Sequence, residues 1–321
     1  MFHKLNNYIN FSYIILDNIN NEIYLIFKYK NSFMGCKMIP SAFSYYRPSK
    51  VDEAVGLISS LGEDARVIAG GHSLIPVMKQ RLTDIKHLID LSAIDEIKGI
   101  QIKNNVVSIG AMTTQVELIN NEELFKVAPI IREASLQIAD PQVRNLGTIG
   151  GNVANGDPAN DMPGLMQLLD ATYNLSGVNG SREVKARDFY EGAYFTSRED
   201  DEILISISFE SPSGGYAYEK QKRKIGDYAT AAAGVIIKVE NNKCSSASIA
   251  LTNLSDTPVY CDKAVDMIVG KEIDNDLLDQ VTKTCVDQSD PVADQRGPVE
   301  FKKYVAGIVI KKALKRAIEK V

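Results

Sequence analysis

The sequence has few residues of the kinds that bind metal ions. It contains 4 cysteines and 3 histidines in 321 residues, and no two cysteines form a Cys-x-x-Cys pair. A zinc or iron–sulfur site built from this chain alone would therefore lack ligands. The widely spaced cysteines fit reduced thiols of a cytoplasmic protein better than a disulfide framework. We therefore expect any metal of the functional assembly to lie in a partner chain.

Positive charge and long apolar runs are also scarce. There are 36 Lys and Arg against 41 Asp and Glu, which gives a net charge of −5 and no basic block. Such a chain has no obvious way to neutralise a phosphate backbone, so the sequence predicts no nucleic-acid binding. No apolar run is long enough for a membrane span. The predicted location is cytoplasmic, with a peripheral position at the inner membrane face left open.

Residues 1–37 differ in composition from the rest of the chain. Asn, Ile, Tyr and Phe supply twenty-one of these thirty-seven positions, and Ala, Pro, Val and Arg are absent. One interpretation is a short extension, such as a hairpin with a turn at Asn18-Ile19-Asn20-Asn21. The other, which we favour, is an upstream A/T-rich stretch read as protein, with the native start at Met34 or Met38. N-terminal sequencing of the native protein distinguishes the two.

From Met38 onward, hydrophobic periodicity predicts a mixed helix-and-sheet protein with two domains. A cluster of small turn residues, Ser211-Pro-Ser-Gly-Gly215, predicts the boundary between domains at 38–213 and 214–321. Helices are predicted at Val51–Leu61, Thr114–Asn120, Val127–Ile138, Pro163–Leu169, Asp262–Val269, Asn275–Asp287 and Phe301–Lys320. Strands are predicted at Arg66–Ala69, His87–Leu91, Ile97–Ile102, Val106–Ile109, Thr172–Ser176, Glu202–Phe209, Tyr216–Lys222, Ala232–Val239 and Ala247–Leu254.

A glycine run directly follows the strand predicted at Arg66–Ala69. In Gly70-Gly71-His72-Ser73-Leu74, two glycines allow a sharp turn that places successive backbone N–H groups in a concave nest. Ser73 adds a hydroxyl donor, so the nest suits a pyrophosphate. A tight turn that holds no ligand fits the same residues, and a histidine such as His72 is more often structural than catalytic.

A second run, Thr148-Ile149-Gly150-Gly151-Asn152, repeats these features about 75 residues later. Two such nests could hold one diphosphate from both sides. Asp161 could accept hydrogen bonds from ribose hydroxyls or could cap the helix that begins near Pro163. Neither run has the spacing of a dinucleotide-binding fingerprint or the ending of a P-loop, which disfavours a nucleotide fold with a single nest.

The motifs resemble those of one protein family in order and spacing. The segments Ala69–Pro76, Asp140–Asn152, Asn155–Pro163 and Tyr218–Ala229 resemble the FAD-binding medium subunits of the molybdenum hydroxylases, which include xanthine dehydrogenases and aerobic carbon monoxide dehydrogenases. The likeness covers nearly everything from Met38. It implies the α+β fold class: a two-part FAD-binding domain of the vanillyl-alcohol-oxidase-like (PCMH) type, followed by a C-terminal antiparallel sheet with helices.

The resemblance also implies roles for individual residues. Residues of the two runs should hold the FAD diphosphate: Val67, Ile68, Ala69, Gly70, Gly71, His72, Ser73, Leu74, Thr148, Ile149, Gly150, Gly151 and Asn152. Asp161 should bind the ribose or ribityl region, and Leu204 should touch the adenine. Lys220 and Tyr228 should approach the flavin, with Lys222 as the alternative to Lys220. Ile138 should lie near the isoalloxazine ring, where xanthine dehydrogenases have an aromatic residue.

The implied function is electron transfer by non-covalently bound FAD. The resemblance implies a large molybdopterin-binding partner, which carries the molybdenum cofactor and oxidises the substrate, and a small partner with [2Fe–2S] clusters. It further implies a dimer of heterotrimers. No residue of this chain is assigned as a general acid, base or nucleophile, and the substrate stays open between carbon monoxide, purines, other heterocycles and aldehydes.

Two other functions fit parts of the sequence. One is a stand-alone flavin oxidase with FAD linked covalently to His72, because some oxidases of this superfamily use a similar Gly-Gly-His turn. The other is a nucleotide-binding module without redox function. Acid precipitation and bleaching by dithionite distinguish these alternatives.

Overall fold

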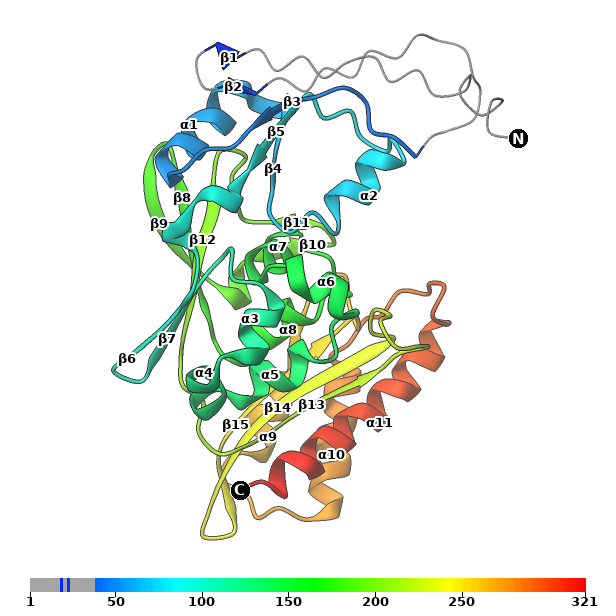
Figure 1. Cartoon of the computed structure of the whole chain (residues 1–321). Helices are drawn as coiled ribbons and strands as arrows, with labels where there is room; N and C mark the ends of the chain where they lie inside the picture. The colour runs from blue at the N-terminus through cyan, green and yellow to red at the C-terminus, as the bar shows by residue number, and fades with distance from the viewer. Residues whose placement is uncertain (1–17, 20–21, 24–37) are drawn as a thin grey trace, which may run out of the picture.

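Residues 38–321, together with the backbone of residues 18–19 and 22–23, are described in this computed structural model. The three larger sheets follow one another along the chain, the first at the top of Figure 1 and the last at the bottom. Among the described residues, no helix is long and apolar enough to cross a membrane.

The first sheet has a parallel core of three strands in the order β3-β5-β4. The apolar face of α1, which spans the predicted Val51–Leu61, packs on it through Ala54 and Ile58. The elements of this part are β3 (Ser44–Tyr46), α1 (Val51–Leu61), η1 (Gly62–Asp64), β4 (Ala65–Ile68), α2 (Leu74–Lys79), β5 (His87–Asp90), η2 (Leu91–Ala93) and η3 (Asp95–Ile97).

Two short strands lie at the edge of this sheet. β1 (Asn18–Ile19) pairs with β2 (Glu22–Ile23), and Ile23 pairs with Tyr45 of β3. The antiparallel pairing agrees with a hairpin, but Asn18 and Ile19 belong to its first strand and not, as predicted, to its turn. The rest of residues 1–37 lie outside the described part of the chain, so the favoured start at Met34 or Met38 stays a prediction.

The second sheet is antiparallel, in the order β6-β7-β12-β8-β9. Asn104 and Asn105 both have positive φ at the tip of the predicted hairpin, as a tight two-residue turn requires. The strands are β6 (Ile100–Lys103), β7 (Val106–Gly110), β8 (Thr172–Gly177), β9 (Gly180–Lys185) and β12 (Ile203–Glu210), with η4 (Ala186–Asp188) and a small hairpin of β10 (Tyr190–Gly192) and β11 (Phe195–Thr196).

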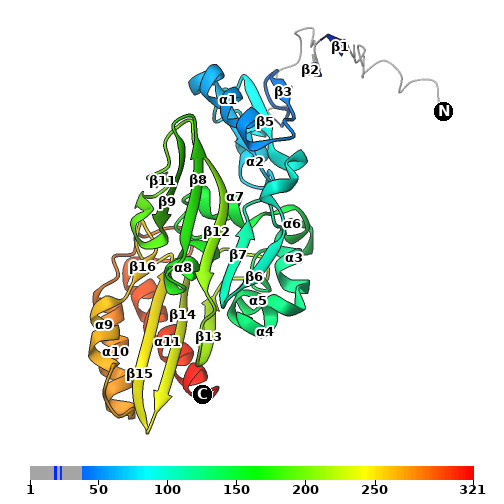
Figure 2. The same cartoon turned by 90° about the vertical axis from the view of Figure 1, so that its left-hand side faces the viewer.

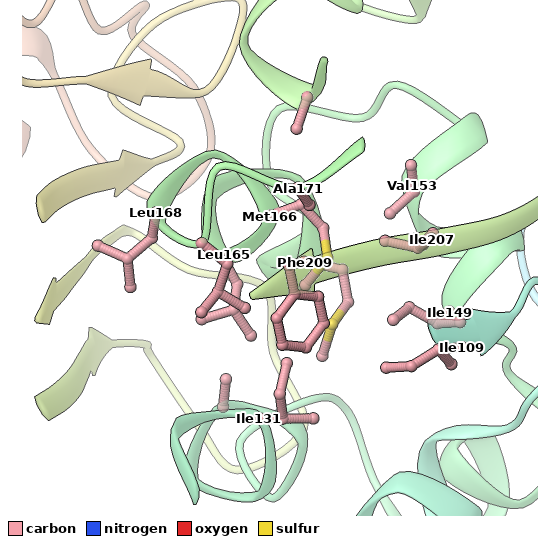
Figure 3. Close-up of a cluster of buried hydrophobic side chains, with 14 of the residues drawn as sticks. Ile109, Ile131, Ile149, Val153, Leu165, Met166, Leu168, Ala171, Ile207 and Phe209 are labelled. Carbon is pink, nitrogen blue, oxygen red and sulfur yellow. The ribbon is translucent and has the colours of Figure 1, made fainter. Parts of the chain in front are cut away.

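Six helices pack beside the second sheet and cover its core. Ile109, Ile207 and Phe209 of the sheet point toward Ile131, Leu165 and Met166 of the helices (Figure 3). These helices are α3 (Gln115–Asn120), α4 (Glu122–Val127), α5 (Pro129–Ser135), α6 (Pro141–Leu146), α7 (Ile149–Ala154) and α8 (Asp161–Leu168).

The helix predicted over Val127–Ile138 is shorter in the structure, where α5 spans Pro129–Ser135. Val127 instead ends α4, and Ala128 between the two helices has φ −144 and ψ 62. Pro129 explains the break, because the ring of a proline disfavours helical geometry in the residue before it. Proline itself is accommodated at the first position of α5.

The third sheet is antiparallel and has helices on both faces, which confirms the predicted C-terminal architecture. Alternate residues of β14 belong to two cores: Ala232 and Ile236 face α8, whereas Val235 and Ile237 face α11. Figure 2 shows β13, β14 and β15 between these helices. The elements are β13 (Gly215–Gln221), β14 (Ala231–Glu240), β15 (Lys243–Thr252), β16 (Val259–Tyr260), α9 (Asp262–Ile268), α10 (Asn275–Asp287) and α11 (Val299–Ile318).

Candidate functional site

The first glycine run forms an open turn between β4 and α2. The backbone N–H groups of the four residues from Gly70 to Ser73 have no acceptor in the described part of the chain. Gly71 has a φ of 74°, a conformation that glycine adopts without strain. The Ser73 side chain makes no capping bond to α2, although Ser73 occupies the N-cap position. The run thus presents a row of free donors, which suits an anion.

The two glycine runs, each with the residues that directly precede it, lie against each other. A Cβ atom on Gly70 would collide with the Leu146 carbonyl oxygen and would lie 2.8 Å from the Cα atom of Gly147. A Cβ atom on Gly151 would lie 3.4 Å from the Cβ atom of Ala69. The close approach therefore depends on the absence of a side chain at Gly70, and it joins runs that are far apart in the sequence.

The second run differs from the first in how its backbone is used. The N–H group of Gly150 donates to the Ala111 carbonyl at 2.9 Å, and that of Gly151 donates to the Thr148 hydroxyl oxygen at 3.1 Å. These groups are already satisfied, so the second run does not repeat the free nest of the first. Its available groups are the Thr148 hydroxyl proton and the side-chain amide N–H groups of Asn152.

Asp161 is held by the C-terminal domain and does not cap a helix. It is the first residue of α8, after the N-cap Asn160. One carboxylate oxygen lies 2.7 Å from the Lys220 Nζ atom, and the other accepts a hydrogen bond of 2.6 Å from the Tyr218 hydroxyl. The side chains of Lys220 and Asp161 are only 1% and 4% exposed. Their contact is a buried ion pair between α8 and β13.

Three cationic side chains surround the backbone segment 137–139. The Gln137 carbonyl accepts from Lys220 Nζ at 3.3 Å and from Lys222 Nζ at 3.4 Å, and the Ile138 carbonyl accepts from Arg144 Nη1 at 2.8 Å. Burial and the charge of Lys220 lower the pKa of Lys222. Of these three side chains, only Lys220 is neutralised by the Asp161 carboxylate. The region around segment 137–139 therefore carries an excess of positive charge.

The remaining predicted residues lie on separate elements around these groups. Ile138 and Leu204 are buried, at 7% and 5% exposure, whereas Tyr228 is 43% exposed on the loop between β13 and β14. His72 is exposed and faces Gly147. Asn152 connects the second run to α8, since its side-chain oxygen accepts from the Met162 N–H at 3.2 Å.

Several neighbours of this site were not among the predicted binding residues. Tyr218, Gln137 and Arg144 make the contacts that fix Asp161 and the 137–139 segment. Arg144 and Tyr218 lie within the motif segments that carried the resemblance. Gln137 acts through its backbone carbonyl, which no side-chain pattern can indicate.

The arrangement can hold a diphosphate with an attached aromatic system. The N–H groups of residues 70–73 and the Thr148 hydroxyl are the donors of the two runs. The region around segment 137–139 adds cationic side chains and the apolar Ile138. This donor set fits FAD, whose diphosphate is an anion and whose ring system needs apolar contacts. Within the described residues, no group of three or more His, Cys, Asp or Glu could hold a metal ion.

Comparison with known families defines the class of protein. The family described as "FAD binding domain in molybdopterin dehydrogenase" matches residues 41–211, and "CO dehydrogenase flavoprotein C-terminal domain" matches residues 216–317. The chain therefore belongs to the FAD-binding medium chains of the molybdenum hydroxylase family, and it is an oxidoreductase subunit.

Individual relatives sharpen this assignment. The chain is 51% identical over 282 residues to the carbon monoxide dehydrogenase medium chain of Afipia carboxidovorans, a match that covers 87% of this chain and 98% of the relative. It is 40% identical over 282 residues to the Hydrogenophaga pseudoflava medium chain, with the same coverage. The fold matches the solved Cu,Mo-CO dehydrogenase with a TM-score of 0.87, covering 88% of this chain and 100% of that chain.

Proposed function

We propose that this chain is the electron-transfer subunit of a molybdenum hydroxylase complex that oxidises carbon monoxide. It receives electrons from [2Fe–2S] clusters of a small partner subunit and passes them to an external acceptor. A large partner subunit holds the molybdenum cofactor and carries out the substrate chemistry. The proposed assembly is a cytoplasmic dimer of heterotrimers, which could bind at the inner membrane face through its partners.

The observation that carries this proposal is the contact between the two glycine runs. Among residues 38–321, no acceptor pairs with the backbone N–H groups from Gly70 to Ser73, and this row of donors begins where Gly70 meets Gly147. A turn that served only to connect β4 with α2 would not need an opposing run at this distance. The paired runs instead form one binding site for a diphosphate.

Bound FAD supplies the capacity to accept electrons singly and to release them in pairs. The chain contributes binding and electrostatics. The first run donates backbone hydrogen bonds to the diphosphate, and Thr148 adds its hydroxyl. Leu204 contacts the adenine, and Ile138 and Tyr228 contact the ring system.

The charges of the site assign different roles to the two lysines. Lys220 is neutralised by Asp161 at 2.7 Å, so its main role is to fix Asp161 and β13. Lys222 and Arg144 then supply the uncompensated positive charge near the flavin. Such charge favours the anionic reduced form of the cofactor and raises its midpoint potential.

Carbon monoxide is the preferred substrate because the relatives at 51% and 40% identity are both carbon monoxide dehydrogenase chains. A glyceraldehyde dehydrogenase chain from Sulfolobus acidocaldarius is 33% identical over 279 residues. An aldehyde is therefore the second substrate to test.

The test is purification of the native complex through a tag on this chain. We expect a molybdopterin-containing large chain, a small iron–sulfur chain, and FAD that acid precipitation releases into the supernatant. Carbon monoxide should bleach the flavin in the absence of an acceptor. Yellow colour that stays in the protein pellet, or the absence of both partners, would contradict the proposal.

A further inference from the structure

The loop between α10 and α11 is fixed by an ion pair whose lysine is buried. The backbone groups of Asp294 and Gly297 bond to each other, with N–H to carbonyl distances of 3.2 and 3.1 Å. The Asp294 carboxylate lies 3.0 Å from Lys302 Nζ, and the Lys302 side chain is only 3% exposed. This anchor gives the loop one defined conformation.

Arg296 extends from this loop onto the ring of Tyr228. Its guanidinium carbon lies 5.4 Å from the ring centroid, within the range of a cation–π contact. Its Nη1 atom pairs with Asp294 at 2.9 Å, and the side chain is 19% exposed. A second contact joins the same two loops, because Arg223 donates to the Gln295 carbonyl at 3.2 Å.

The charge of Arg296 reaches aromatic residues of both domains. Burial and then the charge of Asp157 raise the pKa of Tyr228, and they raise the pKa of Tyr194 to about 12. The positive charge of Arg296 has the opposite effect and lowers the pKa of both tyrosines. Since Tyr194 and Asp157 belong to the FAD-binding domain, Arg296 belongs to a cluster that bridges the two domains beside the flavin site.

We infer that Arg296 is a positioning residue of the flavin site. It fixes the half-exposed ring of Tyr228 against the cofactor. Because Asp294 is shared between Arg296 and Lys302, the three side chains add one net positive charge there. The inference rests on the proposed function, in which Tyr228 contacts the flavin. Asp294 and Lys302 act through Arg296 by holding its loop in place.

The test is a double-mutant cycle on the full chain, with FAD affinity measured by absorbance titration and the flavin potential by equilibration with redox dyes. We expect R296M to raise the FAD dissociation constant about two- to five-fold, the range of an exposed or partly buried cation–π contact. The potential should fall, because a nearby positive charge is lost. In the presence of Y228A, R296M should cause no further loss of affinity.

The matched control is R132M. Arg132 lies 3.9 Å from the centroid of the Phe125 ring, pairs with Glu122 at 2.8 Å and is also 19% exposed. Its partners Asn121, Glu122 and Phe125 all lie on or beside α4, and none is a candidate site residue. Its loss should therefore leave the affinity and potential unchanged. R296K, which keeps the charge without the planar stack, should retain the potential better than the affinity.

The outcomes separate this inference from the proposed function. The positioning role is overturned if R296M lowers the FAD affinity equally with and without Y228A. It is also overturned if R132M lowers the FAD affinity as much as R296M does. If the wild type binds FAD but Y228A changes nothing, the inference fails and FAD binding stands. If the wild type binds no FAD, the proposed function fails and the inference fails with it. Should R296M not fold, R296K in the same cycle with Y228A decides between these outcomes.

Discussion

Gly70 is the residue at which the contact between the glycine runs is most sensitive to an added side chain. We expect Gly70→Ala to weaken FAD binding by about 1–3 kcal/mol. The new methyl group would collide with the Leu146 carbonyl oxygen, a backbone atom that cannot turn aside as a flexible side chain could. The measurement is an absorbance titration of the full chain with FAD. Gly56→Ala is the matched control, since a Cβ atom there has no atom within 4 Å. Equal affinities in the two variants would contradict the account of the runs.

Asp294 should contribute stability that depends on pH. Burial alone would raise its pKa, but hydrogen bonds from Lys302 and Arg296 outweigh burial and lower the pKa. A carboxyl whose folded pKa is depressed contributes fully above the unfolded value of about 3.9 and loses its contribution as the pH falls through the folded value.

The urea unfolding free energy should therefore differ between wild type and Asp294→Asn by a constant amount from about pH 7 to pH 5. The difference should shrink below about pH 4, once the carboxyl of the unfolded chain is protonated. Asp266→Asn is the control, because Asp266 is exposed and makes no ion pair among the described residues. A difference that grows as the pH falls would contradict the sign of this effect.

At the scale of elements, the Asp161–Lys220 pair joins helix α8 to strand β13. Lys220→Met leaves the buried Asp161 carboxylate without its counter-charge, so we expect a loss of about 3–5 kcal/mol in unfolding free energy. The double variant Asp161→Asn with Lys220→Met should recover a large part of this loss. Chemical unfolding of all variants measures both values.

An exposed ion pair provides the control for this experiment. The side chains of Lys311 and Asp279 are 38% and 57% exposed, so Lys311→Met should cost at most about 1 kcal/mol. Additive losses from the single variants Asp161→Asn and Lys220→Met would show that the two side chains do not interact in the folded protein.

Most elements could be predicted because their signals are local. The limits of α1 follow from periodic apolar residues, and the turn at Asn104-Asn105 follows from residues that tolerate positive φ. Pro129 indicates the break at Ala128, but the apolar pattern continues across Ala128 and by itself predicts one helix.

The candidate site could be predicted only in part, because its contacts are long-range. The glycine runs indicated two turns, yet the sequence did not show that only the first leaves its N–H groups free. The N–H groups of the second run donate to Ala111, Thr113 and Thr148, and the first two of these lie far from the run in the sequence. The pairing of Asp161 with Lys220 joins residues 59 positions apart, and no local pattern encodes it.

At the scale of the whole molecule, the site depends on both domains. Helix α8 carries Asp161 and also packs on the sheet of the C-terminal domain, where a Cβ atom on Gly164 would collide with Thr252. Lys220 of β13 and Tyr228 of the following loop are the candidate site residues of the C-terminal domain. We therefore expect FAD to stabilise both domains together, by about 2.7 kcal/mol at a concentration one hundred times its dissociation constant.

The central claim is that this chain relays electrons through FAD between a partner and an acceptor. The most direct measurement is the rate of acceptor reduction by the purified complex with carbon monoxide, before and after removal of FAD and after its restoration. The account predicts that removal abolishes acceptor reduction, leaves the iron–sulfur clusters reducible by carbon monoxide, and is reversed by added FAD. Acceptor reduction at an unchanged rate in the FAD-depleted complex would contradict it.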